Sequence, residues 1–481
     1  MRLTSLTIEN FKSIASLSLT DFHRLDVFIG KNNSGKSNIL DAAMLFLRTS
    51  PVPAALFDVE NAHIEAQFAL ESQDCKACGI GQKKTLFRCV MSPGQKKSYF
   101  VNGAEIDAAR GRNFLMHHTV HINTSKLLLE HRRDVDAQIQ SGDITIFFAQ
   151  SAYQELYTQY PEMYAAFLAA LHDMFPQITY RPNEKLFDNI AKLRESSALN
   201  FGAEIHEGDE VRTVANLGSG YLQLMVVLVF LFHPRYSFVI IDEPENHLHI
   251  GLQKKLLKII KSFDTRKHII ISTHSPLFIT PDDFDQLHRV VKNDRLQTQV
   301  FPVLEMHKRI DIQRLSQELN LESNEMLFAD HVILVEGEAD EILIRGLLDR
   351  FYIGKKEVLV LAVHSNTNFK IYRDVLRYFT IPYTIMTDRD SLQGYVDVID
   401  EAIGSAKGMP FPEKLALLKK QRIYVLPEGA LERHYPRTYQ NRDDSKPINA
   451  LRAAKNITPD ELRSARMKPI LEVLESVHGG G

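Results

Sequence analysis

The sequence predicts an α/β protein built from two successive parts, and three observations predict this class. A short apolar run leads into the glycine-bounded loop 30–37 and then into a helical pattern. A second apolar run, 238–241, ends in adjacent carboxylates. After residue 325 the alternation of buried strands with helices begins again, which is typical of a parallel sheet with crossover helices.

The loop Gly30-Lys31-Asn32-Asn33-Ser34-Gly35-Lys36-Ser37 matches the P-loop pattern between a strand and a helix. Its glycines allow backbone N–H groups to face a polyphosphate at the N-terminus of the following helix. We expect Lys36 to reach the β- and γ-phosphates and Ser37 to hold Mg²⁺. The sequence therefore predicts that the chain binds ATP through Asn32, Asn33, Gly35, Lys36 and Ser37.

Length and composition set broad limits. A chain of 481 residues is long enough for several domains, and its formal net charge of −3 means that DNA contacts would depend on local basic patches. The longest apolar run, 224–232, is far shorter than the roughly 20 residues that span a membrane. Residues 1–11 lack the apolar core of a signal peptide. We therefore expect a soluble, cytoplasmic protein without a membrane partner.

Three cysteines, an odd number in a long chain, argue against a disulfide framework. Cys75 and Cys78 are either half of a zinc site, which Cys89 or His63 would complete, or part of a reduced hairpin loop.

The chain divides into four predicted segments. Residues 1–124 contain the P-loop and a β-rich lobe, and residues 125–200 have the pattern of a helical insertion, a candidate dimerisation arm. Residues 201–310 are expected to complete the ATPase. Residues 325–481 are expected to form a separate domain with a C-terminal tail.

The second ATPase segment contributes three more candidate motifs. Ser219 and Gly220 precede a strongly apolar helix, so they lie at a helix N-terminus that suits an anion. At the end of strand 238–242, Asp242 suits Mg²⁺ coordination through water, and Glu243 suits polarising the attacking water. His274 follows another buried strand, where it either senses the γ-phosphate or is merely packed or exposed.

The P-loop and these three motifs occur in the same order as in the ABC-type ATPases of the RecF and SMC-like group, which the chain resembles over about residues 1–300. The sequences Ile8-Glu9-Asn10-Phe11-Lys12 and Asp242-Glu243-Pro244-Glu245-Asn246-His247-Leu248-His249 fit that group better than membrane transporters. The resemblance implies that two heads meet face to face, so that Ser219 and Gly220 of one complete the nucleotide site of the other. We therefore expect a homodimer or a higher even oligomer, with Gln67 as the candidate glutamine-loop residue.

Carboxylates follow the strands of the C-terminal segment. Glu336 follows strand 331–335, and strand 383–387 ends in Asp388-Arg389-Asp390. Because parallel strands end at one edge of a sheet, these acids should converge. Converging carboxylates repel one another unless a divalent metal is bound. A solvated acidic turn is the alternative.

This pattern resembles a Toprim domain, and its position after the ATPase resembles the OLD (overcoming lysogenization defect) family over nearly the whole chain. Toprim nucleases of that family use two divalent metals. The resemblance places these ions, Mg²⁺ or Mn²⁺, on Glu336, Asp340, Asp388, Asp390 and a later acid, for which Glu432 is preferred over Glu428. It also implies a basic residue near the metals, and Lys468 matches best, with a solvated surface lysine as the alternative.

The resemblance thus implies an ATP-hydrolysing, metal-dependent DNA endonuclease in defence against phage, with DNA and an accessory protein or nucleic acid as partners. An ATP-driven DNA clamp whose Toprim domain does not cleave is the alternative. Strand passage would need a tyrosine on a separate DNA-binding domain, and primer synthesis usually needs a zinc module. The sequence contains neither pattern in complete form.

Overall fold

The computed structural model describes residues 1–47, 61–71, 85–92, 96–125, 145–182, 203–208, 210–212, 218–263, 267–301, 321–365, 368–389 and 409–478. The chain forms two compact units, residues 1–279 with 283–300, and residues 280–282 with 301–481. Cys75 and Cys78 lie outside the described residues, whereas Cys89 is a buried free thiol. None of the described helices is both long and apolar enough to cross a membrane.

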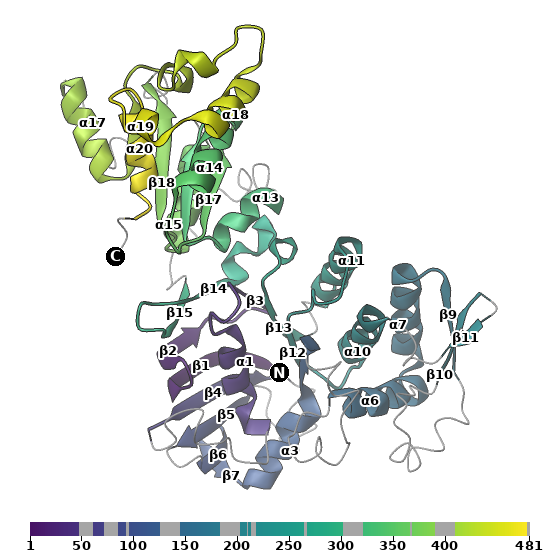
Figure 1. Cartoon of the computed structure of the whole chain (residues 1–481). Helices are drawn as coiled ribbons and strands as arrows, with labels where there is room; N and C mark the ends of the chain where they lie inside the picture. The colour runs from purple at the N-terminus through teal and green to yellow at the C-terminus, as the bar shows by residue number, and fades with distance from the viewer. Residues whose placement is uncertain are drawn as a thin grey trace. The chain divides into compact units, whose positions relative to one another are not determined.

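An antiparallel sheet begins the first unit, with strand order β2-β1-β4-β5-β6-β7. Its strands are β1 (Arg2–Phe11), β2 (Ile14–Thr20), β4 (His63–Leu70), β5 (Thr85–Ser92), β6 (Lys96–Val101) and β7 (Ala104–Ile106). Burial alternates along β4 and β5, as expected for strands with one face on a core. The P-loop helix α1 (Lys36–Met44) contacts both β1 and β12 and so lies between this sheet and the next (Figure 1).

The second sheet of this unit has the order β15-β14-β3-β13-β12-β8. Its strands are β3 (Leu25–Ile29), β8 (Thr119–Asn123), β12 (Phe238–Asp242), β13 (His268–Thr273), β14 (Leu287–Lys292) and β15 (Thr298–Phe301). Strands β8, β12, β13, β3 and β14 pair in parallel. Every residue of β3, β12 and β13 is buried, which is typical of a sheet covered on both faces. The carboxyl ends of these strands therefore share one edge.

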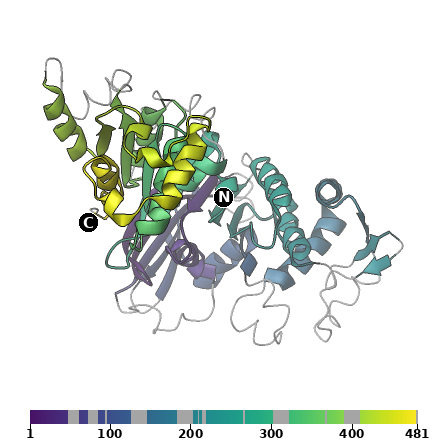
Figure 2. The same cartoon turned by 45° about the horizontal axis from the view of Figure 1, so that its top comes forward.

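Helices α6 (Thr145–Gln159), α7 (Pro161–Met174) and α10 (Ser219–Phe232) pack together beside this parallel sheet. They lie across it from the antiparallel sheet in both views (Figures 1 and 2). Helix α10 is almost entirely apolar and is buried almost throughout, as expected for a helix without a polar face. A small sheet, β11-β10-β9, adjoins them, with β9 (Ile178–Pro182), β10 (Ala203–Glu207) and β11 (Glu210–Arg212).

The segment predicted as a helical insertion is thus not wholly helical. Strand β9 lies inside it and pairs antiparallel with β10. Its sequence, Ile-Thr-Tyr-Arg-Pro, is rich in β-branched and aromatic residues, which favour strands. The remaining helices before residue 300 are α3 (Ala108–His118), α11 (Ile250–Lys261), η1 (Leu45–Leu47), η5 (Pro276–Phe278) and η6 (Pro281–Gln286).

A buried aspartate anchors the strand that leads into the P-loop. Asp26 on β3 lies 3.2 Å from His268 Nε2 and 3.0 Å from His288 Nε2. The Leu3 N–H donates to His268 Nδ1, so Nε2 carries the proton that is donated to Asp26. Burial alone would raise the pKa of Asp26, but hydrogen bonds from these two histidines and His23 hold it well below its ordinary value. This cluster ties β1, β3, β13 and β14 together.

The second unit contains a parallel sheet of order β17-β16-β18-β19. Its strands are β16 (His331–Val335), β17 (Val358–Ala362), β18 (Tyr383–Asp388) and β19 (Ile423–Leu426). Helices α14 (Glu338–Phe351), α18 (Lys446–Asn456) and α20 (Lys468–Glu475) contribute to its main core. The other helices are α13 (Leu321–Asn324), α15 (Phe369–Tyr378), α17 (Phe411–Lys420), α19 (Pro459–Leu462), η7 (Glu325–Leu327), η9 (Leu431–Arg433) and η10 (Arg437–Tyr439). The predicted alternation of strands and helices is confirmed here.

A buried histidine makes the stability of this unit depend on pH. His331 is fully buried, and its Nε2 lies 2.9 Å from Thr384 Oγ1. Burial, with the charges of Arg422 and Lys356, lowers the pKa of His331 to about 4. An unfolded histidine titrates near 6.5, so this contribution to stability is complete above about pH 6.5 and is lost as the pH falls toward 4.

Between pH 8 and pH 5 we expect His331 to remove about 2 kcal/mol from the free energy of unfolding of the second unit. His331→Gln, which has no such titration, should lose correspondingly less over the same range. Calorimetric unfolding of both full-length proteins at the two pH values measures this difference. Equal losses in variant and wild type would contradict it.

Candidate functional site

The P-loop lies at the carboxyl end of β3 and requires glycine at two positions. Gly30 and Gly35 have φ of +153° and +111°. A β-carbon on Gly30 would lie 2.2 Å from Val290 O, and one on Gly35 would lie 2.1 Å from Thr298 Oγ1. Neither position accepts a side chain, because both the conformation and the space exclude one. Strands β14 and β15 therefore hold the loop from outside.

Lys36 is buried within this loop. Its Nζ donates to Gly30 O at 2.6 Å and to Lys31 O at 3.0 Å. Burial lowers the pKa of Lys36, whereas the carboxylates of Glu243 and Asp242 act against this shift. The amine is thus held by backbone carbonyls, and its charge interacts with the carboxylates at the end of β12.

Two oxygen ligands suited to Mg²⁺ face each other at this edge. Ser37 Oγ lies 3.5 Å from Asp242 Oδ1, and Asn123 Nδ2 donates to Asp242 Oδ2 at 3.0 Å. Ser272 Oγ also donates to Asp242. Burial raises the pKa of Asp242, while the hydrogen bond from Ser272 opposes this rise. A hydroxyl and a carboxylate are hard oxygen donors, so the chemistry of this pair fits Mg²⁺.

Glu243 follows directly and has a left-handed backbone, with φ of +54°. Its Oε2 accepts hydrogen bonds from Asn246 Nδ2 at 2.9 Å and Ser125 Oγ at 3.0 Å. Burial would raise the pKa of Glu243, but these hydrogen bonds and the charges of His274 and Lys36 lower it overall. The carboxylate is therefore ionised at neutral pH, as a group that polarises water must be.

His274, which follows β13, lies beside two carboxylates of the loop after β12. Its Nδ1 is 4.0 Å from Glu243 Oε1 and 3.1 Å from Glu245 Oε1. Glu245 is buried and also accepts from Thr273 Oγ1 and from the His274 N–H, both at 2.7 Å. The structure thus brings together five predicted residues at one sheet edge: Lys36, Ser37, Asp242, Glu243 and His274.

The other predicted nucleotide contacts are more dispersed. Asn32 and Asn33 are exposed in the P-loop, where Asn33 Oδ1 accepts from Lys292. Ser219 and Gly220 begin α10, and a β-carbon on Gly220 would lie 2.6 Å from His247 O of the same chain. Gln67 lies within the antiparallel sheet, paired with Ser5 and Arg88, so its contact with nucleotide stays a prediction.

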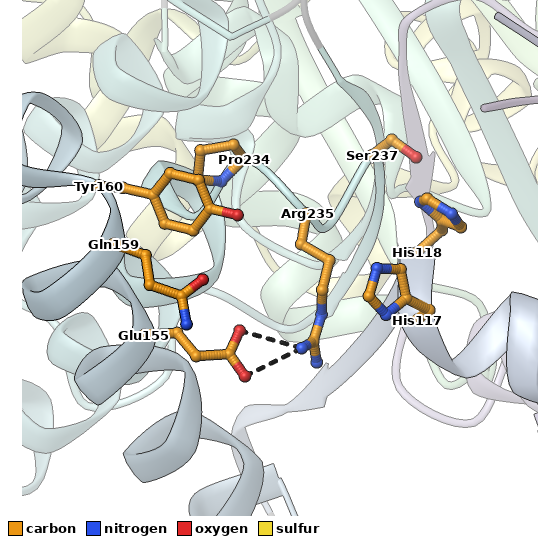
Figure 3. A pocket seen from close by; sticks show the side chains of 8 residues that line it. All are labelled: His117, His118, Glu155, Gln159, Tyr160, Pro234, Arg235 and Ser237. Atoms are coloured by element: carbon orange, nitrogen blue, oxygen red, sulfur yellow. Dashed lines mark hydrogen bonds and ion pairs between the residues drawn. The ribbon is translucent and has the colours of Figure 1, made fainter. Parts of the chain in front are cut away.

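A pocket of about 380 Å³ lies at the opposite end of strands β8 and β12. It is lined by His117, His118, Glu155, Gln159, Tyr160, Pro234, Arg235 and Ser237. Figure 3 shows the Arg235 guanidinium directed at Glu155, with Nη1 donating to both carboxylate oxygens at 3.1 and 3.0 Å. His118 and Ser237 precede these strands, whereas the nucleotide candidates follow them. The pocket is therefore separate from the nucleotide edge.

Four predicted acids of the second unit interact electrostatically. Glu336 follows β16, Asp388 ends β18, Asp340 lies in the first turn of α14, and Glu432 lies in η9. Burial raises the pKa of Asp340 to about 7, and the charges of Asp388, Glu336 and Glu432 add to this rise. Asp340 Oδ2 accepts from the Gly337 N–H at 3.0 Å, which partly opposes it. A bound cation would relieve this repulsion.

The donor types of this cluster fit Mg²⁺ or Mn²⁺, which prefer carboxylate oxygens. No three of the described His, Cys, Asp and Glu side chains are arranged to hold a metal ion, and Asp390 lies outside the described residues. Glu428 is exposed, whereas Glu432 is half-buried and acts on Asp340. Exposure and charge therefore favour Glu432 over Glu428 as the later acid of the cluster, and its role as a metal ligand stays a prediction.

A lysine that sequence reasoning missed lies beside these acids. Lys446 Nζ is 3.1 Å from Glu432 Oε1. The hydrogen bond with Glu432 raises the pKa of Lys446, and the charges of Asp388 and Asp340 act in the same direction. Both Lys446 and Lys468, the residue chosen from sequence, are exposed, and Lys468 lies at the start of α20. The sequence carries no signal for Lys446, because it lies in a polar stretch typical of a solvated surface.

Three family models match separate parts of the chain. Residues 1–89 match "AAA ATPase domain", and residues 127–280 match "AAA domain, putative AbiEii toxin, Type IV TA system". Residues 327–390 match "Overcoming lysogenization defect protein-like, TOPRIM domain". The third match contains Glu336, Asp340, Asp388 and Asp390.

Several similar proteins carry nuclease names. The OLD nuclease of Thermus scotoductus is 23% identical over 448 residues, which cover 81% of this chain and 82% of that protein. Endonuclease GajA of Bacillus cereus is 29% identical over 164 residues, which cover 33% of this chain and 27% of GajA.

Among solved structures, an SMC head bound to the C-winged helix domain of ScpA has a TM-score of 0.46 at 15% identity, covering 62% of this chain and 97% of that one. The SMC head domain of Thermotoga maritima has a TM-score of 0.38 at 16% identity, covering 63% and 100%. Both scores are too low to establish a shared fold by themselves. By its sequence match, the chain is a homologue of the OLD nuclease. Its matches to AAA-type ATPase models precede its match to an OLD-like TOPRIM model.

Proposed function

We propose that this chain is an ATP-hydrolysing, metal-dependent DNA endonuclease of the OLD type that acts in the cytoplasm. The observation that carries the proposal is that candidate active-site residues gather at the edges of two separate parallel sheets in one chain. One edge gathers Lys36, Asp242 and Glu243, and the other gathers acids around Asp340. The match to a protein named OLD nuclease over 81% of the chain supports cleavage as the output.

At the first edge, each group has a distinct role in ATP hydrolysis. Lys36 binds the β- and γ-phosphates, and backbone N–H groups from Asn32 to Gly35 surround them. Ser37 and Asp242 hold Mg²⁺, Glu243 polarises the attacking water, and His274 contacts the γ-phosphate. Ser219 and Gly220 of a second copy complete the site, so the protein works as a homodimer or a higher even oligomer.

At the second edge, Glu336, Asp340, Asp388, Asp390 and Glu432 would hold Mg²⁺ or Mn²⁺. Such ions, when bound, supply an activated water and stabilise the leaving 3′-oxygen of a cleaved phosphodiester. The fit rests on the carboxylate oxygens that these acids supply and on the charges of Asp388, Glu336 and Glu432 acting on Asp340, which a bound cation would offset. As the family resemblance implies, the role is defence against phage, with an accessory protein or nucleic acid as a further partner.

Lys446 is the cation that we expect to stabilise charge on the scissile phosphate. Lys446→Ala should lower the rate of DNA cleavage about 100-fold, because the charge beside Glu432 and Asp388 is lost. Lys468→Ala, the matched control, should change the rate less than about threefold: both lysines are exposed, but among the described residues only Lys446 is seen paired with one of these acids. Plasmid cleavage by both variants at saturating metal measures this. A larger loss in Lys468→Ala would restore the sequence-based assignment.

The second candidate is an ATP-driven DNA clamp without cleavage, the alternative that the sequence leaves open. Incubating the full-length protein with supercoiled plasmid and Mg²⁺ or Mn²⁺, with and without ATP, separates the two candidates. Nicked or linear plasmid that EDTA prevents supports the nuclease, whereas ATP-dependent DNA binding without cut product supports the clamp.

A further inference from the structure

Within the described part of the chain, the two side-chain donors to Glu243 bind the same carboxylate oxygen. Asn246 Nδ2 and Ser125 Oγ both donate to Oε2, at 2.9 and 3.0 Å. The other oxygen, Oε1, lies 4.0 Å from His274 Nδ1. One oxygen is thus fixed by neutral donors, while the other is directed toward the side of the site that His274 occupies.

The two donors come from different parts of the chain but form one unit. Ser125 follows β8, and Asn246 lies in the loop after β12. Asn246 Nδ2 also lies 2.9 Å from Ser125 Oγ and 3.3 Å from Thr124 Oγ1. Asn246 therefore links the end of β8 to the loop that carries Glu243.

Further bonds hold the backbone of this loop in an unusual conformation. Glu243 and His247 both have left-handed φ values, +54° and +57°. Thr124 Oγ1, which is buried, lies 2.6 Å from Glu243 O and 3.0 Å from Asp242 O, and Gln223 Nε2 donates to Pro244 O at 2.8 Å. Left-handed residues other than glycine persist only where neighbouring groups fix them. The surroundings thus determine where Glu243 points.

We propose that Asn246 and Ser125 are positioning residues for ATP hydrolysis, which fix Glu243 Oε2 so that Oε1 is presented to the attacking water. This inference rests on the proposed ATPase role of Glu243. Neither residue is expected to touch the nucleotide, so both should act on turnover rather than on ATP binding. A small displacement of a reacting group is enough for a large loss of rate.

Steady-state ATP hydrolysis by the full-length protein tests this. Asn246→Ala and Ser125→Ala should each lower kcat about 10-fold and leave KM for ATP within about twofold. Ser125→Thr keeps the hydroxyl and should recover most of the lost turnover. Ser18→Ala, on the exposed face of β2, is the matched control and should match wild type. If Asn246→Ala fails to fold, the two Ser125 variants still decide the question.

A double-mutant cycle with Glu243→Gln separates positioning from other roles. In that background Asn246→Ala should change the residual rate less than about twofold, since it acts through the carboxylate. An undiminished 10-fold loss there, a raised KM with unchanged kcat, or wild-type turnover in both single variants would overturn the inference. Wild-type turnover in Glu243→Gln itself would instead overturn the proposed ATPase role of Glu243.

Discussion

Lys36→Ala should weaken ATP binding by about 100-fold and abolish measurable ATP hydrolysis at cellular ATP concentrations. Lys36 Nζ is held 2.6 Å from Gly30 O inside the P-loop, where a triphosphate would replace the backbone carbonyls as its partner. Hydrogen bonds to charged groups contribute about 1.5–3 kcal/mol, which corresponds to this loss of affinity. Isothermal titration of the full-length variant with ATP and Mg²⁺ measures it.

The control for this prediction is Lys258→Ala, which removes an exposed lysine from α11 in the same unit. It should bind ATP like wild type. Wild-type affinity in Lys36→Ala would show that the loop does not hold the phosphates as proposed.

Asp388→Ala should raise the Mn²⁺ concentration needed for half-maximal DNA cleavage by 10- to 100-fold, by analogy with the loss of supporting contacts at other metal sites. Asp388 ends β18. Among the neighbouring charges, that of Asp388 has the largest effect in raising the pKa of Asp340. Removing it lowers both the charge of the cluster and the number of its ligands. A Mn²⁺ titration of plasmid cleavage measures the shift.

Asp349→Ala removes an exposed acid from α14 in the same unit and is the matched control, with an unchanged Mn²⁺ requirement. An unchanged requirement in Asp388→Ala as well would mean that these acids form a solvated turn. The ATP-driven clamp would then be the better account of the protein.

Local sequence patterns were sufficient for the buried strands of the two parallel sheets and for the residues that directly follow them. The buried strands before Asp242, His274 and Asp388 lie where their apolar runs predict. The reason is physical: parallel strands bring the residues after them to one edge, so residues with reactive side chains can be identified without long-range information.

Contacts between distant segments could not be predicted in this way. Ser125 and Glu243 are separated by 118 positions, and their hydrogen bond depends on the register between β8 and β12. Lys446 likewise reaches Glu432 through the packing of its helix, and no motif marks it. The strand β9 was missed because a five-residue strand gives a weak periodic signal beside two long helices.

We propose that one chain carries two independent active sites, each at the edge of a parallel sheet, one for ATP and one for DNA. The most direct measurement follows phosphate release and the loss of supercoiled plasmid in the same reactions, with wild type and with Asp388→Ala. At a Mn²⁺ concentration that is half-maximal for wild type, we expect wild type to show both activities. Asp388→Ala should release phosphate at the wild-type rate while nearly all of the plasmid stays supercoiled. Cleavage at the wild-type rate by Asp388→Ala, or loss of both activities in the folded variant, would contradict the claim.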